Sequence, residues 1–200
     1  MPNNGVQAEN AILRPRGDEE RGLMTYLNQI IKLRKLYENK PPWPYLCFED
    51  FVLKNGRFWI PDTLPNNIEP GKLKQCFANA ATLAINDRTL TYVEGFADSI
   101  IPVLHAWCVT KYGVVVDPTW AGTKGTVLPT VGKAYYGVPF SYNYLSKSLI
   151  QNKYFGLIDR CETGFPLLTG KDKDFLDKKF EERRTNGKSR PRKKARNATL

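Results

Sequence analysis

A thiol, an imidazole and a carboxylate follow one another between Cys76 and Asp117. Cys76 stands in front of an alanine-rich stretch, His105 is the only histidine among 200 residues, and Asp117 lies in a Val-Asp-Pro-Thr-Trp sequence. These are the parts of a cysteine nucleophile, its general base and the group that orients the base. The three residue types in this order therefore predict nucleophilic chemistry at sulfur.

The surroundings of Cys76 predict that this residue opens a helix. A loop rich in proline and asparagine over residues 62–71 precedes it, and the alanines that follow favour a helix from about Lys74 to Ile85. A helix N-terminus presents unpaired N–H groups and the positive end of the helix dipole, which stabilise a negatively charged sulfur. A cysteine is more often a buried structural residue, but this position at the start of a rigid helix favours the nucleophile.

A short hairpin is predicted to bring His105 and Asp117 to one face of a sheet. With a loop over residues 111–113, position 107 pairs with 117 and position 105 with 119, so His105 lies diagonal to Asp117. Gly113 suits the left-handed conformation that ends three-residue loops. A two-residue loop would place the two side chains on opposite faces, so the pairing depends on the loop length.

Four pieces of sequence around these residues occur in a familiar order. They are the alanine-rich stretch that opens with Cys (76–84), Val-Glu-Gly-Phe (93–96), His-Ala-Trp-Cys-Val (105–109) and Val-Asp-Pro-Thr-Trp (116–120). Together they resemble the transglutaminase-like cysteine enzymes, a branch of the papain-like fold. The resemblance implies an α+β fold in which a helix bearing the cysteine packs on a small antiparallel sheet bearing the histidine and aspartate.

The resemblance also implies the activity. Cys76 would attack the amide carbonyl of a peptide, a glutamine side chain or a related acyl group, His105 would move the proton, and Asp117 would orient the imidazole. The expected function is a cysteine-dependent amide hydrolase or acyl transferase (peptidase, deamidase or transglutaminase-like) acting through a thioester. Hydrolysis is favoured because it needs no second substrate site. No cofactor is expected, and an active-site loop of larger members is missing.

Several aromatic and polar residues are candidates for the remaining parts of such a site. The nucleophile's own backbone N–H is one expected oxyanion donor. In the family an upstream tryptophan or a polar side chain supplies the other, which makes Trp59 and Gln75 candidates. Trp107, Trp120 and Tyr136 are candidates for the walls of a substrate groove.

Metal binding and disulfide formation are competing uses of the cysteines. His105 and Cys108 are three positions apart, but such neighbours on a strand point to opposite faces, and the sequence has no Cys-x2-Cys pair. No metal site is therefore expected. Cys47, Cys76, Cys108 and Cys161 are widely spaced in a chain long enough to form a core, which favours free thiols.

Composition divides the chain into three parts. Residues 1–16 are polar and are predicted to form a disordered or loosely docked arm, and residues 17–170 to form one catalytic domain. Residues 171–200 are predicted to form a charged helix over 171–184 and then a basic, disordered tail. The net charge of +10 includes six Lys or Arg and no acid from residue 186 onward.

A rival interpretation assigns the chain to binding instead of catalysis. The fold would then be an inactive transglutaminase-like scaffold, and the run Lys188–Arg196 would hold nucleic acid or another polyanion. The aromatic-rich segment 135–154 would offer a base-stacking surface, although ordinary core packing also explains its composition.

The sequence gives no sign of a membrane partner. No run approaches the roughly 18 apolar residues of a membrane span, and the N-terminus lacks the basic-then-apolar pattern of an export signal. These features predict a cytoplasmic protein.

Overall fold

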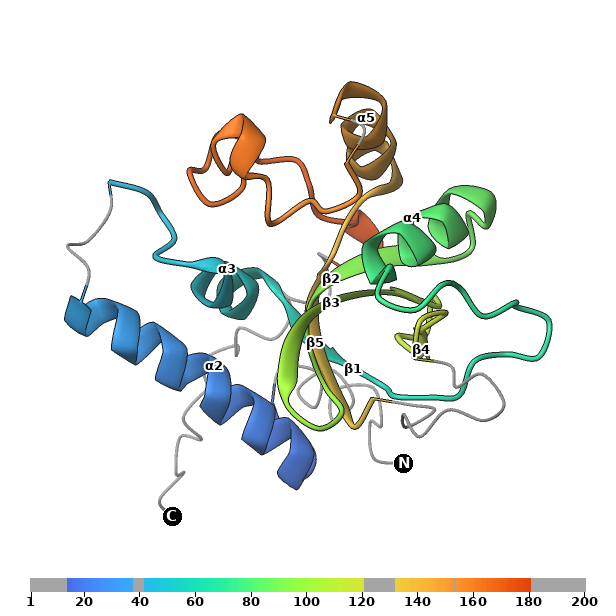
Figure 1. Ribbon diagram of the computed structural model, residues 1–200, viewed down its shortest axis with the longest axis horizontal. Helices are drawn as coiled ribbons and strands as arrows, with labels where there is room; N and C mark the ends of the chain where they lie inside the picture. The colour runs from blue at the N-terminus through green and yellow to red at the C-terminus, as the bar shows by residue number, and fades with distance from the viewer. Residues whose placement is uncertain (1–13, 38–41, 121–131, 153, 181–200) are drawn as a thin grey trace, which may run out of the picture.

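A curled antiparallel sheet forms the centre of the α+β fold (Figure 1). The computed structural model describes residues 14–37, 42–120, 132–152 and 154–180. Within these residues the sheet has five strands in the order β1-β5-β2-β3-β4. The strands are β1 (Arg57–Trp59), β2 (Thr91–Asp98), β3 (Pro102–Val109), β4 (Val115–Val116) and β5 (Ala134–Pro139).

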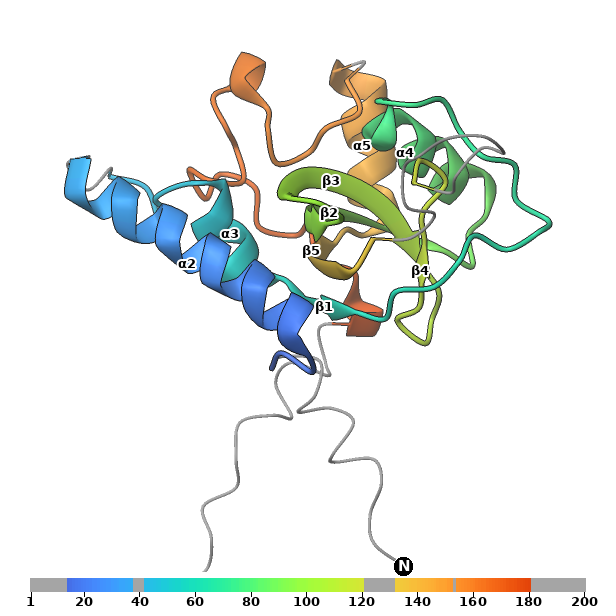
Figure 2. The same ribbon diagram turned by 60° about the horizontal axis from the view of Figure 1, so that its bottom comes forward.

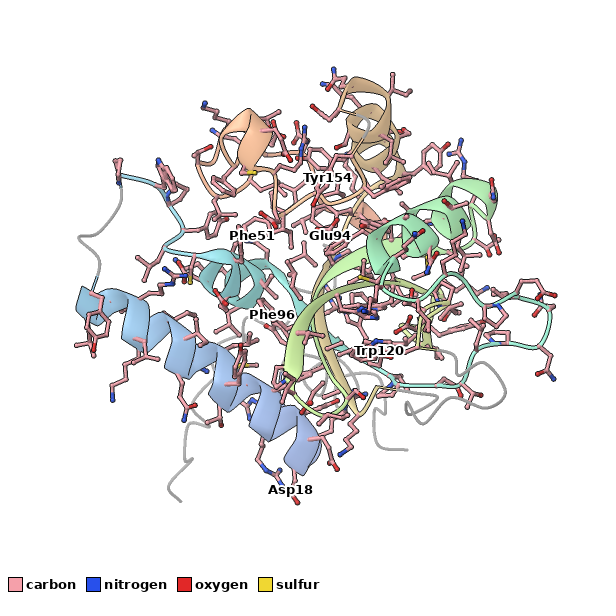
Figure 3. The ribbon with its side chains drawn as sticks, in the orientation of Figure 1. Asp18, Phe51, Glu94, Phe96, Trp120 and Tyr154 are labelled. Carbon is pink, nitrogen blue, oxygen red and sulfur yellow. The ribbon has the colours of Figure 1, made fainter. Side chains whose placement is uncertain are left out.

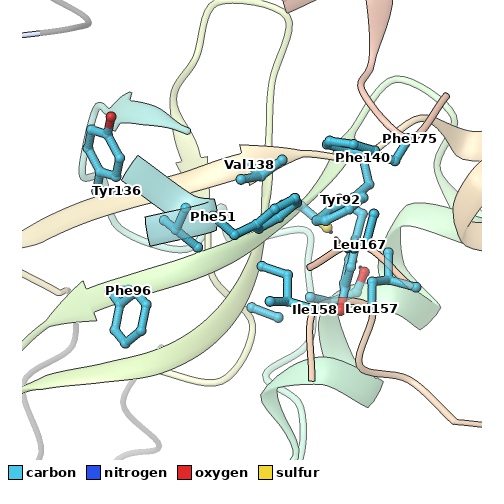
Figure 4. Packing of buried hydrophobic residues seen from close by; sticks show 14 of the residues in the cluster. Phe51, Tyr92, Phe96, Tyr136, Val138, Phe140, Leu157, Ile158, Leu167 and Phe175 are labelled. Carbon is cyan, nitrogen blue, oxygen red and sulfur yellow. Dashed lines mark hydrogen bonds between the residues drawn. The ribbon is translucent and has the colours of Figure 1, made fainter. Parts of the chain in front are cut away.

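Helices cover one face of this sheet. They are α2 (Asp18–Tyr37), α3 (Phe48–Asn55), α4 (Cys76–Asn86) and α5 (Tyr142–Asn152). The helices α2 and α3 pack together near β5, whereas α4 lies on β2 and β3, beside α5 (Figure 2). A large apolar cluster fills the space between these helices and the sheet (Figure 4).

The two edges of the sheet approach each other at Ile60, which follows β1. The Ile60 N–H donates to the Gly113 carbonyl at 2.9 Å, and the Val115 N–H donates to the Ile60 carbonyl at 2.9 Å. The curl encloses a second apolar cluster on the face opposite the helices, which contains Trp59, Val93, Ala97, Trp107, Val109, Val115, Tyr135 and Phe180. Successive side chains of β3 therefore point alternately into the larger apolar cluster beneath α4 and into the second cluster inside the curl.

The hairpin between β3 and β4 has the predicted register. Cys108 pairs with Val116 and Val109 with Val115, which corresponds to a loop over residues 111–113. Gly113 has a φ of 79°, in the left-handed region, and its N–H donates to the Thr110 carbonyl at 2.9 Å. The prediction of a three-residue loop ending in a left-handed glycine is confirmed.

Replacement of Gly113 by valine should lower the free energy of unfolding by about 1–2 kcal/mol, because a β-branched side chain strongly disfavours a positive φ. Space is not the cause, since an added Cβ would meet only the Trp59 ring, at 3.6 Å. Urea unfolding of the variant measures the loss. Gly22→Ala is the matched control: it lies within α2, has open space around it and should be neutral or stabilising. A neutral Gly113→Val would contradict the argument.

Of the charged helix predicted over residues 171–184, residues 171–177 are not helical, and helix begins only at residue 178 among the described residues. This segment instead runs along the domain, where Leu176 bridges Phe140 and Phe175 enters the larger apolar cluster. Phe180 enters the cluster inside the curl and its carbonyl accepts a hydrogen bond from Arg57. Anchoring two phenylalanines in different clusters requires a more extended path than a helix offers. Residues up to 180 thus belong to the same core as the preceding domain.

Both ends of the chain fall largely outside the described residues. Of the predicted arm over 1–16 only residues 14–16 are described, and there Arg16 pairs with Glu20 and donates to the Trp59 carbonyl at 2.8 Å. The basic run Lys188–Arg196 lies outside the described residues. No helix among those described combines the length and apolar character needed to cross a membrane.

Candidate active site

His105 and Asp117 meet across the β3–β4 hairpin. The His105 Nε2 atom lies 2.7 Å from Asp117 Oδ2, and both side chains are buried. The diagonal placement expected from the register brings the two groups into direct hydrogen-bonding contact. The structure thus brings together two of the three residues that the sequence singled out, on the face inside the curl.

Asp117 is held by a set of hydrogen bonds that fixes both carboxylate oxygens. Its Oδ1 accepts from the backbone N–H groups of Thr119 at 2.9 Å and Trp120 at 3.2 Å. Its Oδ2 accepts from the Tyr135 hydroxyl at 3.0 Å as well as from His105. Burial alone would raise the pKa of Asp117, but the charge and hydrogen bond of His105 and the backbone donors outweigh it and lower that pKa.

The His105 imidazole is packed between aromatic rings. Trp120 stacks on it with ring centroids 4.2 Å apart and an interplanar angle of 16°, and Trp107 lies 6.1 Å away. Burial lowers the pKa of His105, but the Asp117 charge, the hydrogen bond to Asp117 and the contact with Cys76 raise it to about 9. The ring is therefore held in one orientation, and Asp117 stabilises a proton that the ring accepts.

Cys76 is the third member of this group. It is half-buried at the first position of α4, and it lies close enough to His105 to contribute to the raised pKa of that imidazole. Because Asp117 occupies Nε2, the Nδ1 atom is the ring nitrogen left for the sulfur. The first N–H groups of α4 have no acceptor within the helix, so they are oriented to donate beside the thiol.

Asn79 ties α4 to the turn that carries Asp117. Its amide donates to the Lys72 carbonyl at 2.7 Å and to Thr119 Oγ1 at 2.9 Å, and its oxygen accepts from the Lys72 N–H at 3.2 Å. The Gly71 N–H donates to the Pro118 carbonyl at 2.7 Å. These bonds fix the loop before Cys76 against the turn after Asp117, so the thiol and the carboxylate are positioned by one network.

The two oxyanion candidates lie in different surroundings. The indole of Trp59 is buried inside the curl and donates to the Gly137 carbonyl at 3.1 Å, so it is not available to a substrate. Gln75 is exposed directly before α4, and its side chain makes no hydrogen bond that caps the helix. Of the two, Gln75 alone is placed beside the thiol.

The three groove candidates also separate. Tyr136 lies on the helix-covered face, where its hydroxyl donates to the Leu53 and Gly56 carbonyls at 3.2 Å (Figure 4). Trp107 is fully buried inside the curl. Trp120 is partly exposed beside the imidazole (Figure 3). The groove role is therefore excluded for Tyr136 and Trp107 and remains a prediction for Trp120.

Sequence reasoning missed Tyr135 and Asn79. Tyr135 comes from β5, which is separated from β4 by two strands, and only the curl of the sheet brings its hydroxyl to Asp117. No local pattern in the sequence indicates that contact. Asn79 does carry a signal, because an amide one turn after a helix-opening cysteine lies on the same side of the helix as the thiol.

Tyr135→Phe should lower the free energy of unfolding by about 1–3 kcal/mol, because it removes a donor to the Asp117 carboxylate and leaves the buried Gly132 N–H without its acceptor. Thermal unfolding of the variant measures this loss. Tyr154→Phe is the matched control, since Tyr154 is exposed and its hydroxyl is not part of the network. Equal effects of the two substitutions would contradict the assigned role.

Stability should also decline as the pH rises from about 6.5 through about 9. The pKa of His105 is raised from 6.5 to about 9 in the folded protein, chiefly by Asp117 acting against burial. A base with a raised folded pKa contributes stability fully below its unfolded pKa, and this is lost as the pH passes the folded pKa. Urea unfolding across this window should show the decline in the wild type and a smaller decline in His105→Gln.

The comparison with His105→Gln is needed because a second group titrates nearby. The Glu94 carboxyl is fully buried, and burial raises its pKa to about 7. An acid whose pKa is raised in the folded protein also makes stability fall as the pH rises. For Glu94 this fall occurs at lower pH than the fall caused by His105, and it is the same in the wild type and in His105→Gln. Identical pH slopes for the wild type and His105→Gln would show that the His105 proton is not stabilised by Asp117.

The four cysteines are free, as predicted. Cys47 and Cys108 are buried, and burial raises the pKa of Cys47 to about 12 and that of Cys108 further. Cys161 is exposed and distant in sequence from the candidate site. Among the described residues no group of three or more His, Cys, Asp or Glu is arranged to hold a metal ion.

Comparisons with known families, proteins and structures found no match to this chain. No family model matches the chain, and neither a curated protein nor a solved structure matches it at the threshold applied.

Proposed function

We propose that the protein is a cysteine-dependent amide hydrolase or acyl transferase with a papain- and transglutaminase-like core. The observation that carries the proposal is the buried contact of His105 Nε2 with Asp117 Oδ2 at 2.7 Å, with Cys76 near enough to the ring to help raise its pKa. A thiol at a helix N-terminus, beside an imidazole that a carboxylate orients, is the arrangement of a cysteine nucleophile. The sequence resemblance to transglutaminase-like enzymes supports the same assignment.

The first half-reaction forms a thioester. His105 Nδ1 takes the proton from the Cys76 sulfur, and the sulfur attacks the acyl carbon of an amide. The oxyanion of the tetrahedral intermediate accepts hydrogen bonds from the first-turn N–H groups of α4, with the Gln75 amide as a second donor. The C–N bond then breaks, and His105 returns the proton to the leaving amine.

The second half-reaction regenerates the thiol. Water gives up a proton to His105 as its oxygen attacks the thioester carbon. The C–S bond then breaks, His105 returns the proton to the Cys76 sulfur, and a carboxylic acid leaves. An amine in place of water would give acyl transfer. We propose hydrolysis as the main reaction because it requires no second substrate site, and amide-containing peptides or side chains as the substrate class.

Thiol reactivity tests this proposal. The protein is treated with a stoichiometric amount of chloroacetamide, and labelling of each cysteine is followed by peptide mass spectrometry. The exposed Cys161 serves as an internal control, because it has the greater access but no imidazole partner assigned. Cys76 should react faster than Cys161, and His105→Gln should abolish that advantage. Faster labelling of Cys161, with Cys76 unaffected by His105→Gln, would contradict the proposal and favour the inactive binding module.

A further inference from the structure

A polar cavity lies between α5 and the segment 160–174, apart from the Cys76 site. It has a volume of about 650 Å³, within the range of small-molecule sites. Its walls come from one side of α5 and from the loops on either side of the short helical turn Cys161–Thr163, at the end of the domain opposite α2 (Figure 1). None of Cys76, His105 and Asp117 lines it.

Positive charge predominates in this cavity. Its charged lining residues are Lys147, Arg160, Lys171 and Lys173 against Asp172 and Asp174. One of the two carboxylates is already engaged, because Asp172 Oδ2 accepts a hydrogen bond from the Tyr144 hydroxyl at 2.6 Å. The balance of four cations and two anions leaves a net charge of about +2 to attract an anion.

Arg160 is the buried cation of the cavity. It is only 6% exposed and lies near Tyr144, where its positive charge opposes the rise that burial and Asp172 cause in the Tyr144 pKa. Among the described residues no carboxylate forms a salt bridge with it. A guanidinium carries five N–H donors in a planar fork, and burying such a charge without an anion is costly. The cavity therefore contains a buried cation that no described carboxylate neutralises by a salt bridge.

Ser148 is a polar group without a partner in the same wall. It is 3% exposed, and its Oγ has no hydrogen-bond partner among the described residues. A buried hydroxyl ordinarily finds a partner in the protein or in a bound molecule. The serine lies one turn after Tyr144 on α5, so the hydroxyl and the Arg160–Tyr144 pair line the same cavity.

We propose that this cavity binds a small molecule that carries a phosphate group. A phosphate dianion matches the net charge of the lining and offers several oxygens to the Arg160 fork, the Ser148 hydroxyl and the ammonium group of Lys147. A carboxylate monoanion would neutralise only half of that charge. This site is separate from the proposed thiol chemistry and does not depend on it.

Isothermal titration of the full chain with inorganic phosphate, at constant ionic strength, tests the proposal. The wild type should bind one phosphate, and Arg160→Lys should weaken binding by about tenfold because the fork geometry is lost while the charge stays. Lys147→Ala, an exposed position that the fold does not need, should weaken binding severalfold. The matched control is Lys111→Ala on the β3–β4 hairpin, which should bind phosphate as the wild type does.

The outcomes decide between the cavity and other sources of binding. Equal affinity in the wild type, Arg160→Lys and Lys147→Ala would overturn the proposal and place the phosphate elsewhere, for example on the basic run Lys188–Arg196. Displacement of phosphate by acetate at comparable concentration would overturn the phosphate assignment in favour of a carboxylate site. Chloroacetamide labelling of Cys76 in the same variants should be unchanged, so failure at one site is distinguishable from failure at the other.

Discussion

Cys76→Ser and His105→Ala should each abolish hydrolysis of an activated acyl ester such as a p-nitrophenyl ester. A serine hydroxyl is a far weaker nucleophile than a thiolate, and His105 is the only imidazole in the chain, so neither function has a substitute. Because residues of such a site act as a unit, each single change should remove nearly the whole activity. Initial rates at substrate saturation, compared with the uncatalysed reaction, measure the loss.

The fold of both variants has to be shown intact for this result to count. Serine is close in size to cysteine, and Cys76 is only half-buried, so Cys76→Ser should unfold as the wild type does. His105→Ala leaves a space beside Trp120 and an unpaired Asp117, and His105→Gln is the better control because it fills more of the space. Wild-type rates in a folded Cys76→Ser would contradict the assignment of the nucleophile.

Asp117→Asn should reduce the same activity by a factor on the order of 10⁴, the size seen when the orienting aspartate of serine proteases is changed in this way. The introduced amide can present an N–H to His105 Nε2, which would stabilise the wrong tautomer and withdraw the base from the thiol. The loss of the carboxylate also removes the main cause of the raised pKa of His105. Ester hydrolysis followed across pH separates the two effects.

A matched aspartate controls for the substitution itself. Asp62 accepts a backbone hydrogen bond from Thr63 in an exposed loop, so Asp62→Asn changes the same chemical group away from the site. It should keep the wild-type rate. An Asp117→Asn variant that is folded and loses less than about tenfold would show that His105 does not depend on Asp117 for its orientation.

The part of the site within the hairpin could be predicted from the sequence because it depends on local rules. The period-2 alternation of strand side chains and the left-handed preference of Gly113 together determine the register. That register places His105 diagonal to Asp117, as the structure shows. The alanine-rich helix that begins at Cys76 is local in the same sense, and its bounds differ from the expected ones by two residues at its start and one at its end.

Features that depend on distant pairing could not be predicted. The face of the sheet on which Trp59 and Tyr136 lie depends on the pairing of β1 with β5. In that pairing Trp59 lies opposite Tyr135, and Phe58 lies opposite Tyr136. A change of one residue reverses the face on which a strand side chain lies. For that reason the sequence suggested Tyr136 for the site, while the structure places its neighbour Tyr135 there.

Glu94 shows the same limit for a charged residue. Its sequence surroundings suit an ordinary solvated strand position, yet its carboxylate is fully buried. It accepts hydrogen bonds from the Tyr92 hydroxyl at 2.6 Å and from the backbone N–H groups of Leu157 at 2.7 Å and Ile158 at 2.9 Å. The two backbone donors lie more than sixty residues further along the chain, so only the folded structure shows that Glu94 joins that segment to the sheet.

The most direct measurement of the central claim is intact-protein mass spectrometry of the acyl-enzyme. The protein is mixed with a p-nitrophenyl acyl ester, quenched in acid, and the modified residue is located by peptide mapping. We predict one acyl group on Cys76 that hydroxylamine removes, with Cys161 unmodified and no acylation of Cys76 in His105→Gln. Equal acylation of Cys161 and Cys76, or an unmodified Cys76 in the wild type, would contradict the thioester mechanism.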